Sequence, residues 1–277
     1  MCQHKGCCGN PEVERILSEV ERKSRRQFLR DLTTGGLLVA LATMDEKARA
    51  DIFMPSISEQ KKVGQQAERQ ILQQYRVVHG PQERWLQRVG ERLRAALDEK
   101  DRRTWDYRFH VIESKEINAF ALPGGPIFMF TGLMDRIHDD SELAAVTGHE
   151  MTHVRLQHWA RAVAAQRKEE LGFLGIVLLT HANRTLQSLG DLALSAIDLK
   201  YSRDEEKQAD IGGLEDMVAA GYNPNGMLEL FDMLEQATKG QPQPPEFLSD
   251  HPLTQERIRY VKQLIQEKYS AYTDRPM

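Results

Sequence analysis

Apolar residues recur at helical spacing along most of the chain after residue 50. Ranges 58–75 and 82–99 place apolar side chains such as Ile71, Trp85 and Leu93 on a charged background, which predicts two amphipathic helices. Five further stretches show helical patterning and are predicted to be helices. They are 171–180, 186–199, 205–220, 227–236 and 254–269.

A short stranded region interrupts the helices. Residues 107–112 alternate and are rich in aromatic and β-branched side chains, which predicts a strand. Ranges 119–122 and 127–130 flank Pro123-Gly124-Gly125-Pro126, a strong turn signal, so we expect these two segments to pair or lie side by side in a small sheet. The predicted fold class is therefore α+β, predominantly helical, with a small sheet.

A long helix is predicted to follow the sheet, starting at Asp140 or Ser141 and running past Ala160. Either residue can cap it, and Glu142 stands in its first turn. A loop should separate two later helices, because residues 240–245 read Gly-Gln-Pro-Gln-Pro-Pro.

Residues 1–50 differ from the rest and are interpreted as an export leader. Arg25-Arg26 precedes an apolar run at 32–44, and Ala48-Arg49-Ala50 has the small residues of a cleavage site. The pattern resembles a twin-arginine signal, which predicts transport by the twin-arginine machinery to the periplasm or cell envelope of a bacterium. Because charged residues flank the cleavage site, an uncleaved leader that tethers the protein to a membrane is the alternative.

The division predicted is thus a leader at 1–50 and one domain at 51–277. Net charge is −4, so no basic field favours nucleic acid as a partner. All cysteines (Cys2, Cys7 and Cys8) lie in the leader, which excludes a disulfide framework or a cysteine nucleophile in the body. With His4 they form either a metal-binding cluster or an exposed tail.

Residues His149-Glu150-Met151-Thr152-His153 carry the main chemical signal, the HExxH pattern. Side chains four apart on a helix share a face, so both imidazoles can bind one zinc ion. Glu150, one position along, can reach a metal-bound water and act as its general base.

A third ligand is predicted on a later helix. One class of zinc protease uses a histidine six residues after the second, but Trp159 stands there. His158 lies about 140° around the predicted helix from His153 and is interpreted as a surface or structural histidine. Glu206 is favoured over Glu205, because Asp210 follows it by one helical turn and can accept a hydrogen bond from a ligating histidine.

These pieces, with others in the same order, resemble the zinc metallopeptidases of the HtpX and CAAX-prenyl-protease type. The further matches are Asn118 to Gly125, Thr131-Gly132-Leu133, Ser141 to Val146, Tyr201-Ser202-Arg203, and His251-Pro252 with Arg257. The chain resembles a minimal soluble, exported form of this group.

The resemblance implies a gluzincin-like fold that binds one Zn²⁺ per chain through His149, His153 and Glu206, with Glu150 as base. It also implies that a strand at the edge of the cleft pairs with extended substrate by β-augmentation. That strand contains Asn118, Ala119, Phe120 and Ala121.

Three residues have open roles. His251 is either a histidine at a helix start or a group that reaches the zinc or the transition-state oxyanion, and as a fourth ligand it would keep the enzyme latent. Arg257 and Tyr201 are weaker candidates for oxyanion stabilisation or for packing around the ligands.

The sequence therefore predicts a zinc metalloendopeptidase that hydrolyses extended or misfolded polypeptides. A latent zinc-protease fold that binds polypeptide as a chaperone or assembly factor is the alternative. Metal handling by the leader cysteines is a third hypothesis.

Overall fold

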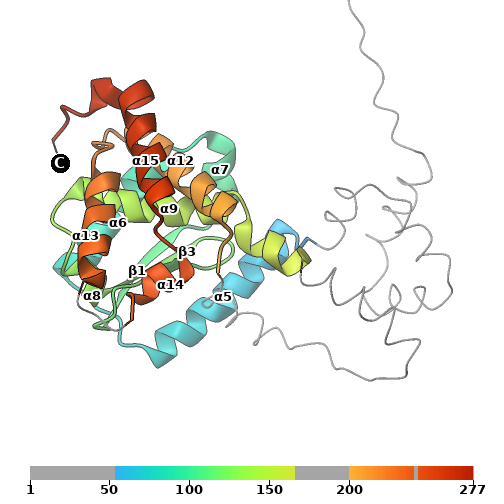
Figure 1. The fold of residues 1–277 in the computed structure, drawn as a ribbon. Coiled ribbons are helices and arrows are strands. Elements are labelled where there is room, and N and C mark those ends of the chain that lie inside the picture. The colour runs from blue at the N-terminus through green and yellow to red at the C-terminus, as the bar shows by residue number, and fades with distance from the viewer. Residues whose placement is uncertain (1–53, 166–199, 240–242, 277) are drawn as a thin grey trace, which may run out of the picture. The chain divides into compact units, whose positions relative to one another are not determined.

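The computed structural model describes residues 54–165, 200–239 and 243–276 (Figure 1). The chain divides into two compact units, of which the larger comprises 55–162 and 178–277 and contains the whole predicted site. The smaller unit is described only at residue 54 and at 163–165. The predicted leader, the predicted helices at 171–180 and 186–199, and residues 240–242 of the predicted loop lie outside the described residues.

Two helices open the larger unit, as predicted. Helix α5 (Ile57–Gln74) begins with a capping box between Ser56 and Glu59, and α6 (Pro81–Ala96) begins with proline at its first turn. The second helix is shorter than expected, because Leu97 leaves the helical conformation and Asp98 caps a separate short helix, α7 (Glu99–Thr104).

The sheet has three strands in the order β1-β3-β2. Strand β1 (Arg108–Ile112) runs parallel to β3 (Pro126–Phe130), and β2 (Ala119–Ala121) pairs antiparallel with β3. The turn between β2 and β3 depends on Gly124 and Gly125, whose φ angles of 88° and 136° favour glycine. The predicted pairing across this turn is confirmed, and β2 is left at the edge of the sheet.

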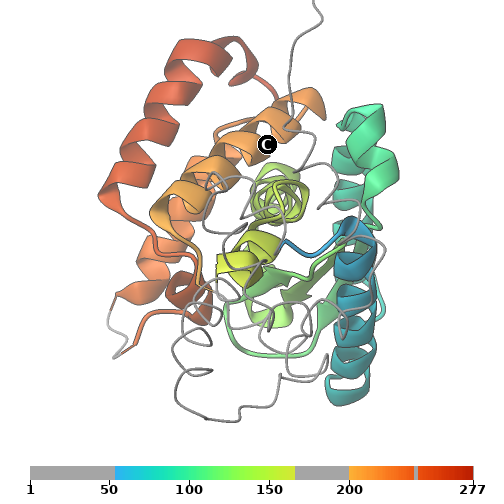
Figure 2. The ribbon, with the colours of Figure 1, turned by 90° about the vertical axis from the view of Figure 1, so that its right-hand side faces the viewer.

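A short helix, α8 (Thr131–Met134), leads to α9 (Asp140–Arg155), which is buried along most of its length. Asp139, rather than the predicted Asp140 or Ser141, caps α9. Helix α9 packs against α6, β2 and two later helices, α12 (Arg203–Ala219) and α13 (Gly226–Thr238). Figure 2 shows α9 nearly end-on, with α12 and α5 on opposite sides of it.

The prediction that this helix runs past Ala160 is wrong. Helix α9 ends at Arg155, and Gln157 adopts a left-handed φ of 57°, after which the chain is helical again from residue 158. The Gln157 side chain accepts a hydrogen bond from Gln60 of α5 over 2.8 Å. This distant contact stabilises a break for which the sequence has no glycine or proline.

The C-terminal part contains a short helix, α14 (Glu246–Asp250), and α15 (Gln255–Leu264), which Thr254 caps. A π-helical turn (Ile265–Tyr269) and a 3₁₀ turn (Ser270–Tyr272) continue α15. The predicted α+β class with a small sheet is confirmed. Among the described residues, none of the helices combines the length and apolarity that crossing a membrane requires.

A partly buried ion cluster connects α5 to the sheet. Glu68 accepts two hydrogen bonds from Arg108 and lies 2.8 Å from His110 Nε2, both on β1. Burial raises the pKa of Glu68, but the hydrogen bonds and charges of His110 and Arg108 outweigh it and lower the pKa from 4.5 to about 2. The ionised carboxylate therefore stabilises the fold above pH 4.5, and this contribution is lost as the pH falls towards 2.

Glu68→Gln should lower the free energy of unfolding near neutral pH by about 2 kcal/mol, because Arg108 and His110 lose their contacts with the charged carboxylate. The difference from wild type should shrink as the pH falls below 4.5. Urea unfolding at several pH values measures it. Glu113→Gln, whose pair with Arg76 is exposed, is the control and should change stability by less than about 1 kcal/mol. A pH-independent difference would contradict the prediction.

Candidate active site

Four side chains from three parts of the fold converge on one point. His149 and His153 project from α9, Glu206 from the first turns of α12, and His251 follows α14. His149 Nε2 lies 3.1 Å from His153 Nε2 and 3.3 Å from His251 Nδ1. Glu206 Oε1 lies 2.9 Å from His251 Nδ1 and 3.4 Å from His153 Nε2.

This donor set fits a metal ion. One ligand atom from each of the four residues lies within 4.8 Å of the others, and all four side chains are buried. Burial lowers the pKa of His153 well below its usual value, which keeps the imidazole neutral and its lone pair available. Burial raises the pKa of Glu206. The charges of His251 and His149, together with its hydrogen bonds, lower this pKa by more, so the carboxylate is ionised. Imidazole nitrogens and a carboxylate are zinc-type ligands.

Asp210 and Arg257 contact two of these four residues, His149 and Glu206. Asp210 Oδ1 lies 3.1 Å from His149 Nδ1, which leaves Nε2 of that ring facing the other ligands. Arg257 donates to both Asp210 oxygens over 2.8 and 2.7 Å, and its Nη1 lies 2.7 Å from Glu206 Oε2. Tyr260, which the sequence analysis missed, also donates to Asp210. Tyr260 stands three positions after Arg257 on α15. Side chains at this spacing share one face of a helix, so the sequence could have placed Tyr260 beside Arg257.

Tyr201 packs against the ligands. Its ring stacks on His153 with centroids 3.8 Å apart and lies 5.3 Å from the ring of His251. Burial and the nearby Glu150 and Glu206 charges raise the pKa of Tyr201 well above 10, so the phenol stays neutral.

Comparison with known proteins places the chain in a family. The model of Peptidase family M48 matches residues 81–265, which contain every side chain of this site. The chain belongs to Peptidase family M48. This confirms the predicted resemblance to HtpX-type zinc metallopeptidases.

Curated relatives of this M48 domain include proteases from bacteria and mitochondria. The beta-barrel assembly-enhancing protease of Escherichia coli (strain K12) is 30% identical over 55% of this chain and 33% of its own length. Metalloendopeptidase OMA1, mitochondrial, of Bos taurus is 34% identical over 56% of the chain and 32% of its own. The mitochondrial metalloendopeptidase OMA1 of Schizosaccharomyces pombe is 30% identical over 76% of this chain and 63% of its own length. The chain thus spans about a third of most of these relatives.

Glu150 lies beside the metal-binding group of the M48 domain. Its side chain is buried, and Oε1 is 3.5 Å from His251 Nε2. Burial raises the pKa of Glu150, while the charges of His251 and His149 and a hydrogen bond from the Ala121 backbone act in the opposite direction. A carboxylate with a raised pKa is suited to accept and release a proton near neutral pH.

Of the two roles predicted for His158, surface or structural histidine, the surface one is wrong. His158 is fully buried, and its Nδ1 lies 2.7 Å from Nδ1 of His153. The break in α9 is the reason, because His158 begins a new helical segment instead of continuing around the old one. Burial lowers the pKa of His158 to about 4, so the ring is neutral at physiological pH.

The predicted substrate strand lies at the edge of the sheet beside α9. Asn118, Phe120 and Leu122 pair with β3, so the backbone groups of Ala119 and Ala121 face away from it. The Ala119 N–H donates to the Asn118 side chain. The Ala121 backbone is among the influences that lower the pKa of Glu150.

Helix α14 contacts the chain just before this strand. The backbone N–H of Phe247 donates to the Ile117 carbonyl over 3.2 Å, and the Phe247 ring stacks on His251. A cavity beside His153 and Ala121 holds only about 10 Å³, too little for a peptide side chain.

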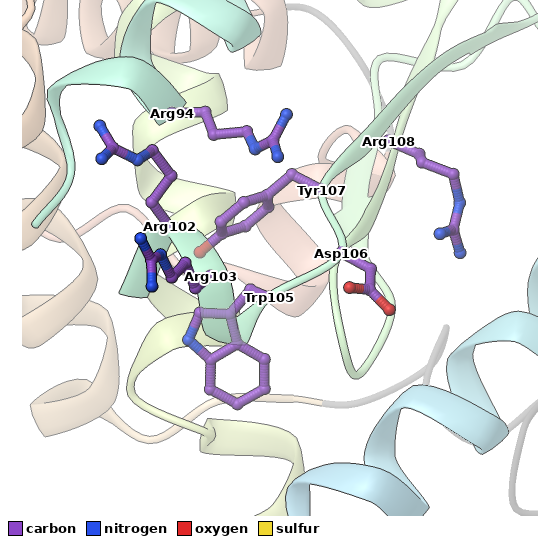
Figure 3. A pocket seen from close by; sticks show the side chains of 7 residues that line it. All are labelled: Arg94, Arg102, Arg103, Trp105, Asp106, Tyr107 and Arg108. Atoms are coloured by element: carbon purple, nitrogen blue, oxygen red, sulfur yellow. The ribbon is translucent and has the colours of Figure 1, made fainter. Parts of the chain in front are cut away.

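A larger cavity of about 490 Å³ lies elsewhere and contains none of the predicted site residues (Figure 3). The residues that line it come from α6, from α7 and from the chain that leads into β1. Three of its arginines already have carboxylate partners. Arg94 pairs with Glu91, Arg103 with Glu99 and Arg108 with Glu68.

Asp210→Asn should weaken binding of a divalent metal by about 10- to 100-fold, because His149 loses the carboxylate that orients it. Competition with a chromophoric chelator measures the affinity. Asp106→Asn, which removes a surface pair with Lys61, is the matched control and should bind metal as wild type does. Unchanged metal affinity in Asp210→Asn would refute the role assigned to Asp210.

Proposed function

We propose that this M48 domain is a zinc-dependent endopeptidase that hydrolyses peptide bonds in extended or misfolded polypeptides. The convergence of His149, His153 and Glu206 beside Glu150 carries the proposal. A zinc ion held there would polarise the scissile carbonyl and lower the pKa of a bound water.

The chain's own groups have distinct tasks in this reaction. Glu150 takes a proton from the attacking water and passes it to the leaving amine, and its raised pKa suits both steps. The outward backbone groups of Ala119 and Ala121 pair with an extended substrate and align it beside Glu150. Asp210 holds His149, and Arg257 balances the charges of Asp210 and Glu206.

The proposed location is the periplasm or cell envelope of a bacterium, reached through the twin-arginine machinery. The Arg25-Arg26 pattern of residues 1–50 supports this, as do relatives named beta-barrel assembly-enhancing protease. An uncleaved leader would add a membrane contact.

His251 is proposed to control the site as a fourth protein ligand. Its Nδ1 lies 3.3 Å from His149 Nε2 and 2.9 Å from Glu206 Oε1, where it would take the coordination position that a catalytic water needs. Because Phe247 stacks on His251 and donates a backbone hydrogen bond to Ile117, displacement of α14 would move His251 and release the contact just before β2.

The position of His251 among the ligands also favours a second candidate function, in which the metal stays latent and the domain binds polypeptide without cleaving it. Suppression of aggregation by Glu150→Gln, together with no cleavage by the wild type, would support this function over proteolysis.

The purified chain should hold about one zinc ion, and Glu150→Gln should keep that zinc while kcat for casein falls by about 10²- to 10⁴-fold. Elemental analysis and a casein assay with and without chelator measure both. Glu83→Gln, at an exposed contact with His79, is the control. Cleavage by metal-free protein, or full activity of Glu150→Gln, would reject the proposed mechanism.

His251→Ala should raise the rate of peptide cleavage by about tenfold, because it removes the fourth ligand and the stacking partner of Phe247 (tenfold corresponds to about 1.4 kcal/mol). A fluorogenic peptide library measures the rate. His79→Ala removes an exposed histidine and should leave the rate unchanged. A lower rate would instead indicate oxyanion stabilisation by His251, and an unchanged rate would exclude both roles.

A further inference from the structure

We propose that His158 is a positioning residue that holds His153 in the orientation and tautomer needed to bind the metal. The inference rests on the proposed zinc function and adds a residue that is neither a ligand nor the base.

The two nitrogens of the His153 ring have different environments. Nε2 lies 3.1 Å from His149 Nε2 and 3.4 Å from Glu206 Oε1, inside the metal-binding group. Nδ1 lies 2.7 Å from His158 Nδ1. Both rings are buried, so water does not compete for this contact. The contact therefore fixes which edge of the His153 ring faces the metal.

The contact also fixes the proton. Two Nδ1 atoms at 2.7 Å share a single proton, since one must donate and the other accept. A metal ligand at Nε2 needs its lone pair, so His153 carries its proton on Nδ1 and donates it to His158. The proton of His158 is then on its own Nε2. The reverse arrangement would put a proton on Nε2 of His153, where the metal binds.

The other ligand of α9 is held by different chemistry. Asp210 accepts from His149 with a carboxylate, whereas His158 accepts from His153 with a neutral imidazole. Tyr201 stacks on the face of the His153 ring and restrains its plane. His158 thus orients the second ligand without adding another negative charge to a buried site that already contains Glu150, Glu206 and Asp210.

The fold creates this contact at the break in α9. Gln157 has a left-handed φ of 57° and is held by Gln60, so the chain re-enters a helix at residue 158. On a continued helix the two rings would lie about 140° apart.

Two variants of His158 with side chains of similar size distinguish a role in orienting His153 from a role in packing alone. His158→Leu removes the acceptor and should weaken zinc binding by about 10- to 100-fold in chelator competition. His158→Asn can place its side-chain oxygen near the position of Nδ1 and should restore most of that affinity. His110→Leu changes a histidine outside the site, on β1, and should not alter zinc affinity. The Co²⁺-substituted Leu variant should also show an altered visible absorption spectrum, because the ligand geometry changes.

A measurement on the unaltered protein removes any dependence on how the variants fold. Two-bond ¹H–¹⁵N NMR of the zinc-loaded wild type should find His153 protonated at Nδ1 and His158 at Nε2. A proton on Nδ1 of His158, or wild-type zinc affinity in His158→Leu, would overturn this inference alone. Equal weakening by Leu and Asn would reduce His158 to a packing residue and also overturn it. A wild type that binds no zinc would defeat the proposed function itself.

Discussion

The metal-binding group depends on the close approach of α9 and α12. Gly148 and Gly213 face each other where these helices pack, and a Cβ on Gly213 would lie only 3.0 Å from the backbone nitrogen of His149. Glu206 stands about two turns before Gly213, and Asp210 about one turn before it. The absence of side chains at these two glycines therefore lets His149 reach both carboxylates. A larger residue at either position would separate donors that must all lie about 2 Å from one ion.

The close approach of α9 and α12 buries the carboxylates of Glu206 and Asp210. Arg257 of α15 balances their negative charge. Burying a carboxylate destabilises the fold unless the carboxylate is paired and hydrogen-bonded. Arg257 contacts both Asp210 and Glu206, and Tyr260 adds a hydrogen bond to Asp210. Burial alone would lower the pKa of Arg257, but these partners raise it overall. The site is thus a continuous polar network in which a C-terminal helix fixes the carboxylates of α12.

Local spacing explains which parts of this site the sequence could predict. His149 and His153 are four apart on a regular helix, and Asp210 follows Glu206 by one turn, so their shared faces follow from helical geometry alone. The turn at Gly124 and Gly125 is equally local. The end of α9 is not, because Gln157 is held by Gln60, 97 positions away in the sequence. Because this break was not predicted, the sequence did not show that the His158 ring contacts His153.

The edge of β2 would link substrate binding to Glu150 if this strand pairs with polypeptide as proposed. The Ala121 backbone is a minor influence that lowers the pKa of Glu150, against the larger effect of burial, which raises it. An extended peptide on β2 would compete for the Ala121 N–H and remove this influence. The pKa of Glu150 would then rise, and its carboxylate would become a stronger base. Under the proposed function, substrate pairing would therefore strengthen the base that activates the attacking water.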